Sequence, residues 1–218
     1  IDSIVEGYRG LIEGAIGRSL TWEQDDITLQ NVQARVRAPS AWMLANIKNA
    51  LLLATSNRSE ASVGYATMDG DTSGSISPIS GIDKSFVRTW LLWLEAQGFK
   101  GLHLVNSLEP SAELRPLSEK QVDEEDLMPY PILNTIERLV FYDLVSPHEC
   151  LEEVNKRYGA VFAKEKLEEF VRRFFRLWAR NQWKRERYAP GFHVDDYSLD
   201  PKSWLRFPIL SAGLEKDI

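Results

Sequence analysis

The chain has 218 residues, of which 44% are hydrophobic and 27% charged, a composition typical of a globular chain that buries one core in one main domain, 1–218. Its formal net charge of −6 disfavours a nucleic-acid-binding protein, and its single cysteine, Cys150, excludes an internal disulfide and a cysteine-rich metal site. Without an apolar run of transmembrane length or a signal peptide, the sequence predicts a cytoplasmic protein that does not contact membranes.

The first third of the chain predicts two helices and a strand. Apolar residues recur at helical spacing over 4–16 and again over 29–46, with an interruption near Pro39. The short apolar run 50–54, bounded by polar residues, is typical of a buried parallel strand. Ligands of open α/β sheets collect outside the carboxyl ends of such strands, so we expect a binding edge directly after it.

The polar segment that follows this strand supplies candidate ligand contacts. Thr55 and Glu60 would lie at the edge of the sheet. Ser59 could cap the helix that Glu60 enters, and free N–H groups at such a helix start favour an anion. The stretch 64–82 is rich in Gly, Ser and Asp, which indicates a loop with close backbone contacts.

The remainder of the chain alternates helices with polar loops. Lys84 to Gln97 is predicted to form a helix with an aromatic face that would pack in the core, and 102–105 a second strand. The acidic, proline-punctuated stretch 106–126 has the length of a lid or a disordered loop. Three helices are predicted over 131–144, 146–158 and 163–182, before an irregular tail. The pattern therefore predicts an α/β fold whose parallel sheet is incomplete and whose second half is largely helical.

Three separated motifs give the chain a family resemblance. They stand in matching order and spacing, and two further segments extend the match. The motifs are Asn31-Val32-Gln33-Ala34-Arg35-Val36-Arg37, Ala54-Thr55-Ser56-Asn57-Arg58-Ser59-Glu60 with Gly64-Tyr65, and Pro110-Ser111-Ala112-Glu113-Leu114-Arg115-Pro116; the further segments are 121–127 and 181–185. Together they resemble the carboxyl-terminal part of the synthetase domain of glutamine-dependent NAD synthetase. The resemblance implies an incomplete Rossmann-like sheet of the adenine nucleotide alpha-hydrolase-like, PP-loop ATPase kind.

The resemblance also implies a reaction. ATP, with Mg²⁺, would adenylate the nicotinate carboxylate of deamido-NAD and release pyrophosphate, and ammonia would then displace AMP to give NAD. Such chemistry needs cations and amides around phosphates, a metal to neutralise developing charge, and a pocket for the pyridine ring.

Site residues are carried over from the matching motifs. By resemblance, the ATP contacts are Thr55, Lys84 and Ser111; the deamido-NAD contacts are Asn31, Arg35, Glu60, Tyr65 and Lys184; the Mg²⁺ ligand is Glu60; and the catalytic carboxylate that would hold ammonium is Asp71. Each residue also has a simpler interpretation. Arg35 and Lys84 could be solvated surface cations, Glu60 could stabilise a helix dipole, Tyr65 could be a core aromatic, and Asp71 could form a turn.

The chain also departs from the family pattern. The ammonia-dependent branch has a lysine where Met68 stands and an aspartate where Ser75 stands, and the Ser-Gly-Gly-x-Asp-Ser phosphate loop does not precede Arg35. Since the chain does not begin with methionine, we expect a fragment or a processed or trimmed chain. Because the phosphate loop is missing, we expect little or no synthetase activity from this chain alone. Its partners would be an upstream phosphate-loop segment, a glutaminase domain or another ammonia source, and a second copy in at least a homodimer.

Two other interpretations compete with this one. A non-catalytic dinucleotide-binding or assembly module derived from an NAD synthetase would keep the pocket and use the aromatic helix 84–97 as a contact surface. A relative that adenylates another substrate, such as a GMP or asparagine synthetase, is disfavoured by the segments 57–60 and 111–116. The three histidines show no metal-ligand spacing.

Overall fold

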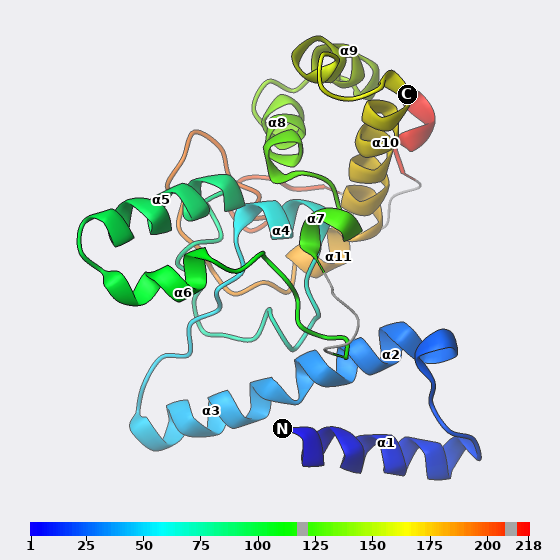
Figure 1. The fold of residues 1–218 in the computed structure, drawn as a ribbon, viewed down its shortest axis with the longest axis vertical. Coiled ribbons are helices and arrows are strands. Elements are labelled where there is room, and N and C mark those ends of the chain that lie inside the picture. The colour runs from blue at the N-terminus through cyan, green and yellow to red at the C-terminus, as the bar shows by residue number, and fades with distance from the viewer. Residues whose placement is uncertain (117–121, 208–212) are drawn as a thin grey trace.

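The structure, a computed structural model, describes residues 1–116, 122–207 and 213–218. Its helical elements, shown in Figure 1, are α1 (Asp2–Ile16), α2 (Trp22–Arg35), α3 (Arg37–Lys48), α4 (Arg58–Val63), α5 (Lys84–Ala96), η1 (Lys100–Leu102), α6 (His103–Asn106), α7 (Asp123–Asp126), α8 (Tyr130–Phe141), α9 (Pro147–Tyr158), α10 (Lys164–Arg180), α11 (Gln182–Arg185) and η2 (Glu215–Asp217). Among the described residues, none of these helices combines the length and apolarity that a membrane span requires.

The amino-terminal helices form a layer at one end of the molecule, with α1 beside α2 and α3 (Figure 1). The helix expected over 29–46 is two helices that meet at Val36, not at Pro39. Pro39 is the third residue of α3, where the amide hydrogen that proline lacks would have had no intrahelical acceptor. Thr21 caps α2, whose first turn contains Glu23 and Asp25, and the backbone of Asp25 departs from helical geometry within this helix.

The hydrophobic core lies in the second half of the chain. It is built mainly from α8, α9 and α10, which Figure 1 shows grouped beside α4. Leu133, Ile136, Val171 and Phe174 have no exposed side-chain surface, and Val63 of α4 packs on this cluster. The three helices expected over 131–144, 146–158 and 163–182 are confirmed, with ends that differ by up to three residues. One side of α4 therefore packs against this core.

The predicted sheet is only rudimentary in the described residues. The segment 50–54 is extended and pairs in parallel with the chain at Ile76 through a single bridge, and a second parallel bridge joins Ser77 to Gly191. The Ala54 amide donates to the Ile76 carbonyl at 2.9 Å. The parallel direction agrees with the expectation, but the expected burial is wrong, because Leu51 and Leu53 are 70% and 52% exposed. The described residues contain these bridges and no longer strands, so helices dominate the whole fold rather than its second half alone.

The predicted strand at 102–105 is wrong, because these residues belong to η1 and α6. Gly98, with φ of 106°, ends the preceding helix, and the chain then turns back along α5. The Asn106 side chain donates to Glu95 Oε2 at 2.6 Å and fixes this return. A run of four residues, three of them apolar, fits a strand and a helix equally well, and here a tertiary contact decides between them.

The helix expected over 84–97 is confirmed as α5, but its expected place in the core is not. Within this chain no residue of α5 is buried, and Phe86, Trp90 and Trp93 are between 42% and 56% exposed. Part of the long loop expected over 106–126 contains the short helix α7, and 117–121 lie outside the described residues.

Candidate functional site

The short helix α4 organises the candidate site, and its first turn is closed by its own side chains. Asn57 Oδ1 accepts from the Glu60 amide at 3.0 Å, while Glu60 Oε2 accepts from the Asn57 amide at 3.2 Å, which is a capping box. The cap is therefore Asn57 and not Ser59, as the sequence suggested. The Arg58 amide donates to the Ile82 carbonyl and the Glu60 amide to Asn57, so two of the first three N–H groups expected to attract an anion here already have acceptors.

Glu60 and Lys84 form an ion pair at the edge of the site. Lys84 Nζ lies 3.0 Å from Glu60 Oε1. The side chain of Lys84 is 21% exposed and that of Glu60 is 17% exposed. Ser56 Oγ donates to the other Glu60 oxygen at 3.1 Å. Lys84, assigned by resemblance to ATP, and Glu60, assigned to the metal and the dinucleotide, thus lie in direct contact although 24 residues separate them.

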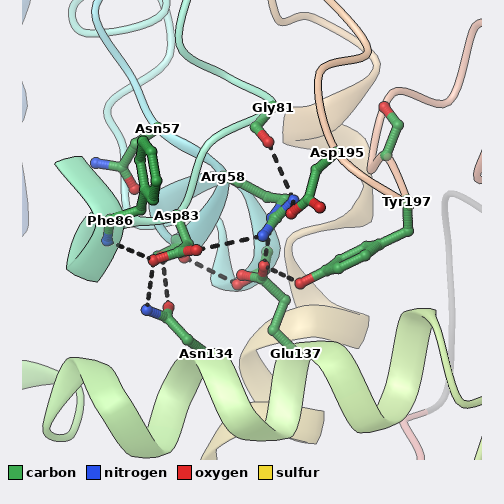
Figure 2. A network of polar contacts seen from close by, with 12 residues as sticks. Asn57, Arg58, Gly81, Asp83, Phe86, Asn134, Glu137, Asp195 and Tyr197 are labelled. Atoms are coloured by element: carbon green, nitrogen blue, oxygen red, sulfur yellow. Dashed lines mark hydrogen bonds and ion pairs between the residues drawn. The ribbon is translucent and has the colours of Figure 1, made fainter. Parts of the chain in front are cut away.

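A polar network fixes the relative positions of α4, α5 and α8 (Figure 2). Ser59 Oγ donates to Asn134 Oδ1 at 2.6 Å and accepts from the Lys84 amide at 2.9 Å. Asn134 also donates to Asp83 Oδ1 at 2.9 Å, and Asp83 caps α5 through the Phe86 amide. The start of the helix that carries Lys84 is therefore tied to the helix that carries Glu60.

Arg58 holds the carboxyl-terminal segment against the same helix. Figure 2 shows its guanidinium between Glu137 and Asp195, with Nε 2.6 Å from Glu137 Oε1 and Nη1 2.7 Å from Asp195 Oδ2. Tyr197 stacks on the guanidinium at 4.1 Å and donates its hydroxyl to Glu137 Oε1 at 2.8 Å. Burial raises the pKa of Glu137, although Arg58 opposes this shift. Burial is the largest single influence on the pKa of Arg58 and lowers it, but the charges of Glu137 and Tyr197 and the hydrogen bonds to Asp195 and Glu137 together raise this pKa above its usual value.

Four of the predicted site residues line one hollow of about 390 Å³ between α2, the end of α4 and the end of α10. They are Asn31, Tyr65, Asp71 and Lys184. The Tyr65 hydroxyl donates to Asp126 Oδ2 at 2.7 Å, and burial together with this carboxylate raises the tyrosine pKa. Burial also lowers the pKa of Lys184, with the nearby Asp71 charge acting in the opposite direction. We call this space the dinucleotide hollow.

Asp71 has the turn-forming contact that the sequence offered as an alternative. Its Oδ2 accepts from the Thr67 amide at 2.7 Å, and the side chain is exposed at the hollow. Asp69, two residues earlier, has φ of 64° and pairs with Arg187 instead. The structure therefore puts Asp71, rather than Asp69, at the hollow.

The remaining predicted residues lie elsewhere. Arg35 is exposed, donates through Nε to the Met68 carbonyl at 3.0 Å and lines a different hollow of about 520 Å³ with Trp42. Ser111 lines a third hollow, of about 330 Å³ between α5 and α6, which also contains Lys84. Thr55 is exposed directly after the 50–54 segment.

A metal ion finds few ligands here. The described residues contain no cluster of three or more His, Cys, Asp or Glu side chains arranged to bind one. Both Glu60 oxygens already accept hydrogen bonds, from Lys84 on one side and from Ser56 and the Asn57 amide on the other. The described residues therefore do not fit a Mg²⁺ site by themselves, and Glu60 would have to release Lys84 to act as a ligand.

Comparison with known proteins identifies the family. The profile described as "NAD synthase" matches residues 2–187, which is most of the chain. The chain belongs to the NAD synthase family. It is 33% identical to a glutamine-dependent NAD(+) synthetase from Rhodobacter capsulatus, over 95% of this chain and 36% of that protein. It is 34% identical to the same enzyme from Xanthomonas campestris pv. campestris (strain 8004), over 96% of this chain and 35% of that protein.

A solved structure of a glutamine-dependent NAD(+) synthetase also matches this chain. The crystal structure of a glutamine-dependent NAD(+) synthetase from Cytophaga hutchinsonii aligns with a TM-score of 0.85 and 50% identity, over 98% of this chain and 33% of that one. The chain thus spans about a third of the length of the relatives it matches. The family resemblance in the sequence motifs is confirmed.

Sequence reasoning missed several buried polar residues that support the NAD synthase motifs. Arg58 stands inside a quoted motif, but its charge was not assigned a role. Glu137 is fully buried and Asn134 partly buried on α8, a segment for which the sequence predicted only a helix. Their signal was a charged or amide side chain at a core-facing helical position, because such groups are rarely buried unless they are paired.

Proposed function

We propose that the chain forms part of an enzyme that amidates deamido-NAD to NAD at the expense of ATP, through an adenylated intermediate. The observation that carries the proposal is the dinucleotide hollow, where residues from three separate parts of a chain of the NAD synthase family meet: Asn31, Tyr65, Asp71 and Lys184. The matching relatives are glutamine-dependent NAD(+) synthetases, and this activity indicates the class of reaction that we propose. The upstream segments of a longer protein would supply the phosphate cradle and the ammonia.

In this proposal the hollow receives the nicotinate end of the substrate. The ring of Tyr65 lines it beside apolar Val63 and Leu127, which suits a flat aromatic ring, and the Asn31 amide offers a donor and an acceptor. The nicotinate carboxylate attacks the α-phosphorus of ATP, and the bond from that phosphorus to pyrophosphate breaks. Ammonia then attacks the acyl carbon, and the bond from that carbon to the AMP oxygen breaks.

Asp71 has the chemistry that the second step needs. A carboxylate at the hollow can hold an ammonium ion and take the proton that leaves nitrogen as the amide forms. The hydrogen bond from the Thr67 amide fixes the orientation of the side chain. Asp71→Asn should therefore lower ammonium-dependent amidation while retaining substrate binding.

Glu60 and Lys84 would serve the phosphates. An ammonium paired with a carboxylate can exchange that partner for a phosphate oxygen, which leaves Glu60 available to a cation that the nucleotide brings. We propose Mg²⁺ in that role, with the other ligands supplied from outside the described residues.

A binding titration tests the proposal directly. Calorimetry of the chain with deamido-NAD should give saturable binding, and Tyr65→Ala should weaken it about tenfold or more through loss of ring stacking. Tyr142→Ala is the matched control, because Tyr142 stacks on Arg138 away from the hollow. Absence of binding by the unchanged chain at millimolar ligand, or equal binding by Tyr65→Ala, would contradict the proposal.

The alternative function, a non-catalytic assembly module, has one observation in its favour. Phe86, Trp90 and Trp93 on α5 are exposed in this chain, and aromatic side chains on a surface often mark a contact with another protein. The two functions separate in one assay: a longer protein that contains this chain should form NAD from deamido-NAD, ATP and ammonium if it is an enzyme. It should bind the dinucleotide without turnover if it is a module.

A further inference from the structure

The start of α5 is held by polar side chains of two other helices. No residue of α5 is buried within this chain, so a buried apolar face contributes little to the placement of the helix. Its first turn is bound instead by Ser59 of α4, whose side chain is fully buried, and by Asn134 of α8. These contacts therefore set where the helix begins relative to the core.

Asn134 contacts the residues on both sides of Lys84. Its Nδ2 donates to Asp83 Oδ1 at 2.9 Å (Figure 2) and to Ser85 Oγ at 2.7 Å. Its Oδ1 accepts from Ser59 Oγ at 2.6 Å, and Ser59 Oγ in turn accepts from the Lys84 amide at 2.9 Å. Residues 83, 84 and 85 thus all bond to the same pair of side chains. We call this pair, Ser59 and Asn134, the α5 anchor.

The chemistry of the partners fixes the direction of each hydrogen bond in the α5 anchor. The Lys84 amide can only donate, so Ser59 Oγ accepts there and keeps its hydrogen for Asn134. An ionised Asp83 carboxylate can only accept, so the amide nitrogen of Asn134 faces it. The first amides of a helix have no intrahelical acceptor. Removal of Ser59 would therefore leave the Lys84 amide without its acceptor beside a fully buried position.

Lys84 is the residue of α5 that reaches the candidate site. Its Nζ lies 3.0 Å from Glu60 Oε1, and the residue lines the hollow of about 330 Å³ that also contains Ser111. A lysine ammonium is a compact charge on a flexible stem, so the position of the backbone decides which oxygens it can reach.

We propose that Ser59 and Asn134 are positioning residues, which hold the start of α5 where Lys84 can exchange Glu60 for phosphate oxygens of the nucleotide. This inference rests on the proposed function, which gives Lys84 to the phosphates. It adds a residue of the core helix α8, outside every motif quoted from the sequence, to the groups on which nucleotide binding depends.

Kinetics of the longer protein that contains this chain test the α5 anchor. Ser59→Ala removes the acceptor of the Lys84 amide, and Asn134→Leu removes the bonds to Asp83 and Ser85. Each variant should raise the KM for ATP about tenfold, because a misplaced Lys84 loses contact with phosphates, and should leave the KM for deamido-NAD within about threefold. A merely structural role would not single out one substrate.

Two neighbouring side chains provide matched controls. Ser62→Ala removes a hydroxyl that is equally buried on α4 but donates to the Ser59 carbonyl within the same helix. Thr135→Val removes a hydroxyl of α8 that bonds to Pro131 and Tyr158 rather than to α5. Both variants should keep the two KM values within about threefold of those of the unchanged protein.

A cycle of double variants separates an effect through Lys84 from any other effect. Lys84→Met should itself raise the KM for ATP about tenfold or more. Adding Ser59→Ala or Asn134→Leu to Lys84→Met should change that value by no more than about threefold, because the anchor then has no ammonium to place. Multiplied losses in the double variants would overturn the inference. An unchanged KM for ATP in Ser59→Ala, or equal increases for both substrates, would do the same.

Hydrogen exchange without any ligand keeps this test separate from the proposed function. In the chain itself, the amides of 84–86 should exchange faster in Ser59→Ala and Asn134→Leu than in the unchanged chain or the two controls, while α8 to α10 remain protected. If the longer protein forms no NAD, or if Lys84→Met leaves the KM for ATP unchanged, the proposed role of Lys84 is wrong and the kinetic part of the inference falls with it. The exchange pattern still decides whether the α5 anchor holds the helix, and equal exchange in all of these proteins would overturn the anchor itself.

Discussion

Removing Arg58 should destabilise the protein strongly, because it leaves Glu137 as a buried charge without a cation. The Glu137 side chain is 0% exposed, and its Oε1 would keep only the hydroxyl of Tyr197 as a donor. Breaking a buried ion pair from one side costs about 3–5 kcal/mol. We therefore expect Arg58→Met to lose about that much free energy of unfolding at pH 8.

The pH dependence of the loss arises from the same carboxyl group. Burial raises the pKa of Glu137, and without Arg58 nothing of comparable strength opposes that shift. A carboxyl group whose folded pKa lies above its unfolded value binds protons more tightly in the folded state, so stability falls as pH rises through the folded pKa. Lowering the pH from 8 should therefore return part of the lost stability to Arg58→Met, at up to about 1.4 kcal/mol for each pH unit between the folded and the unfolded pKa of Glu137.

Urea unfolding followed by fluorescence of the buried Trp178 measures these quantities. Arg138→Met is the matched control: that arginine is 45% exposed, pairs with Asp196 at 3.8 Å, and should cost no more than about 1 kcal/mol. Combining Arg58→Met with Glu137→Leu should restore most of the loss, because an apolar pair needs no counter-charge. A double variant that loses the sum of the two single losses would refute the reasoning.

Three further predictions concern the ends of helices and the cysteine. The carboxyl group of Asp25, hydrogen-bonded to Arg18, should titrate in NMR with a pKa of about 2, and this pKa should move toward its usual value in Arg18→Gln. The stability that this lowered pKa contributes is present above the unfolded pKa and should be lost as the pH falls from about 4 to about 2. Burial raises the pKa of the Cys150 thiol to about 12, so a thiol reagent should label it only in denaturant, and rapid labelling of the folded chain would count against its burial. Asn57→Ala removes the acceptor for the Glu60 amide and should cost about 1 kcal/mol in urea unfolding, with no loss expected if the capping box is incidental.

The sequence was informative where a pattern has one physical solution. The apolar stripes of α8 and α10 and the Ser146-Pro147 helix start left little choice, since a long amphipathic helix must bury its stripe. The family resemblance also led to Asn31, Tyr65, Asp71 and Lys184, which line one hollow although the chain separates them widely. Their grouping came from the family resemblance, because spacing alone does not say which loops meet.

The failures have different physical causes. The run 102–105 is too short for periodicity to separate a strand from a helix, and the contact of Asn106 with Glu95 is not visible in sequence. The cap of α4 was misplaced by two residues because Asn57 and Ser59 are both good caps, and only the position of Glu60, three residues after Asn57, distinguishes them. The partners of a buried charge such as Arg58 lie far along the chain, at Glu137 and Asp195, and no local rule identifies them.

The segment Arg58-Ser59-Glu60 shows why one short motif can support a site with unlike residues. Successive helix residues are rotated by about 100°, so three neighbours face three directions. Arg58 points inward to Glu137, Ser59 reaches Asn134 beside it, and Glu60 meets Lys84 at the accessible edge. Arg58 and Ser59 therefore set the orientation of α4, and only Glu60 is left to face a ligand. A change at Glu60 should affect function with little effect on the core, whereas a change at Arg58 should first affect folding.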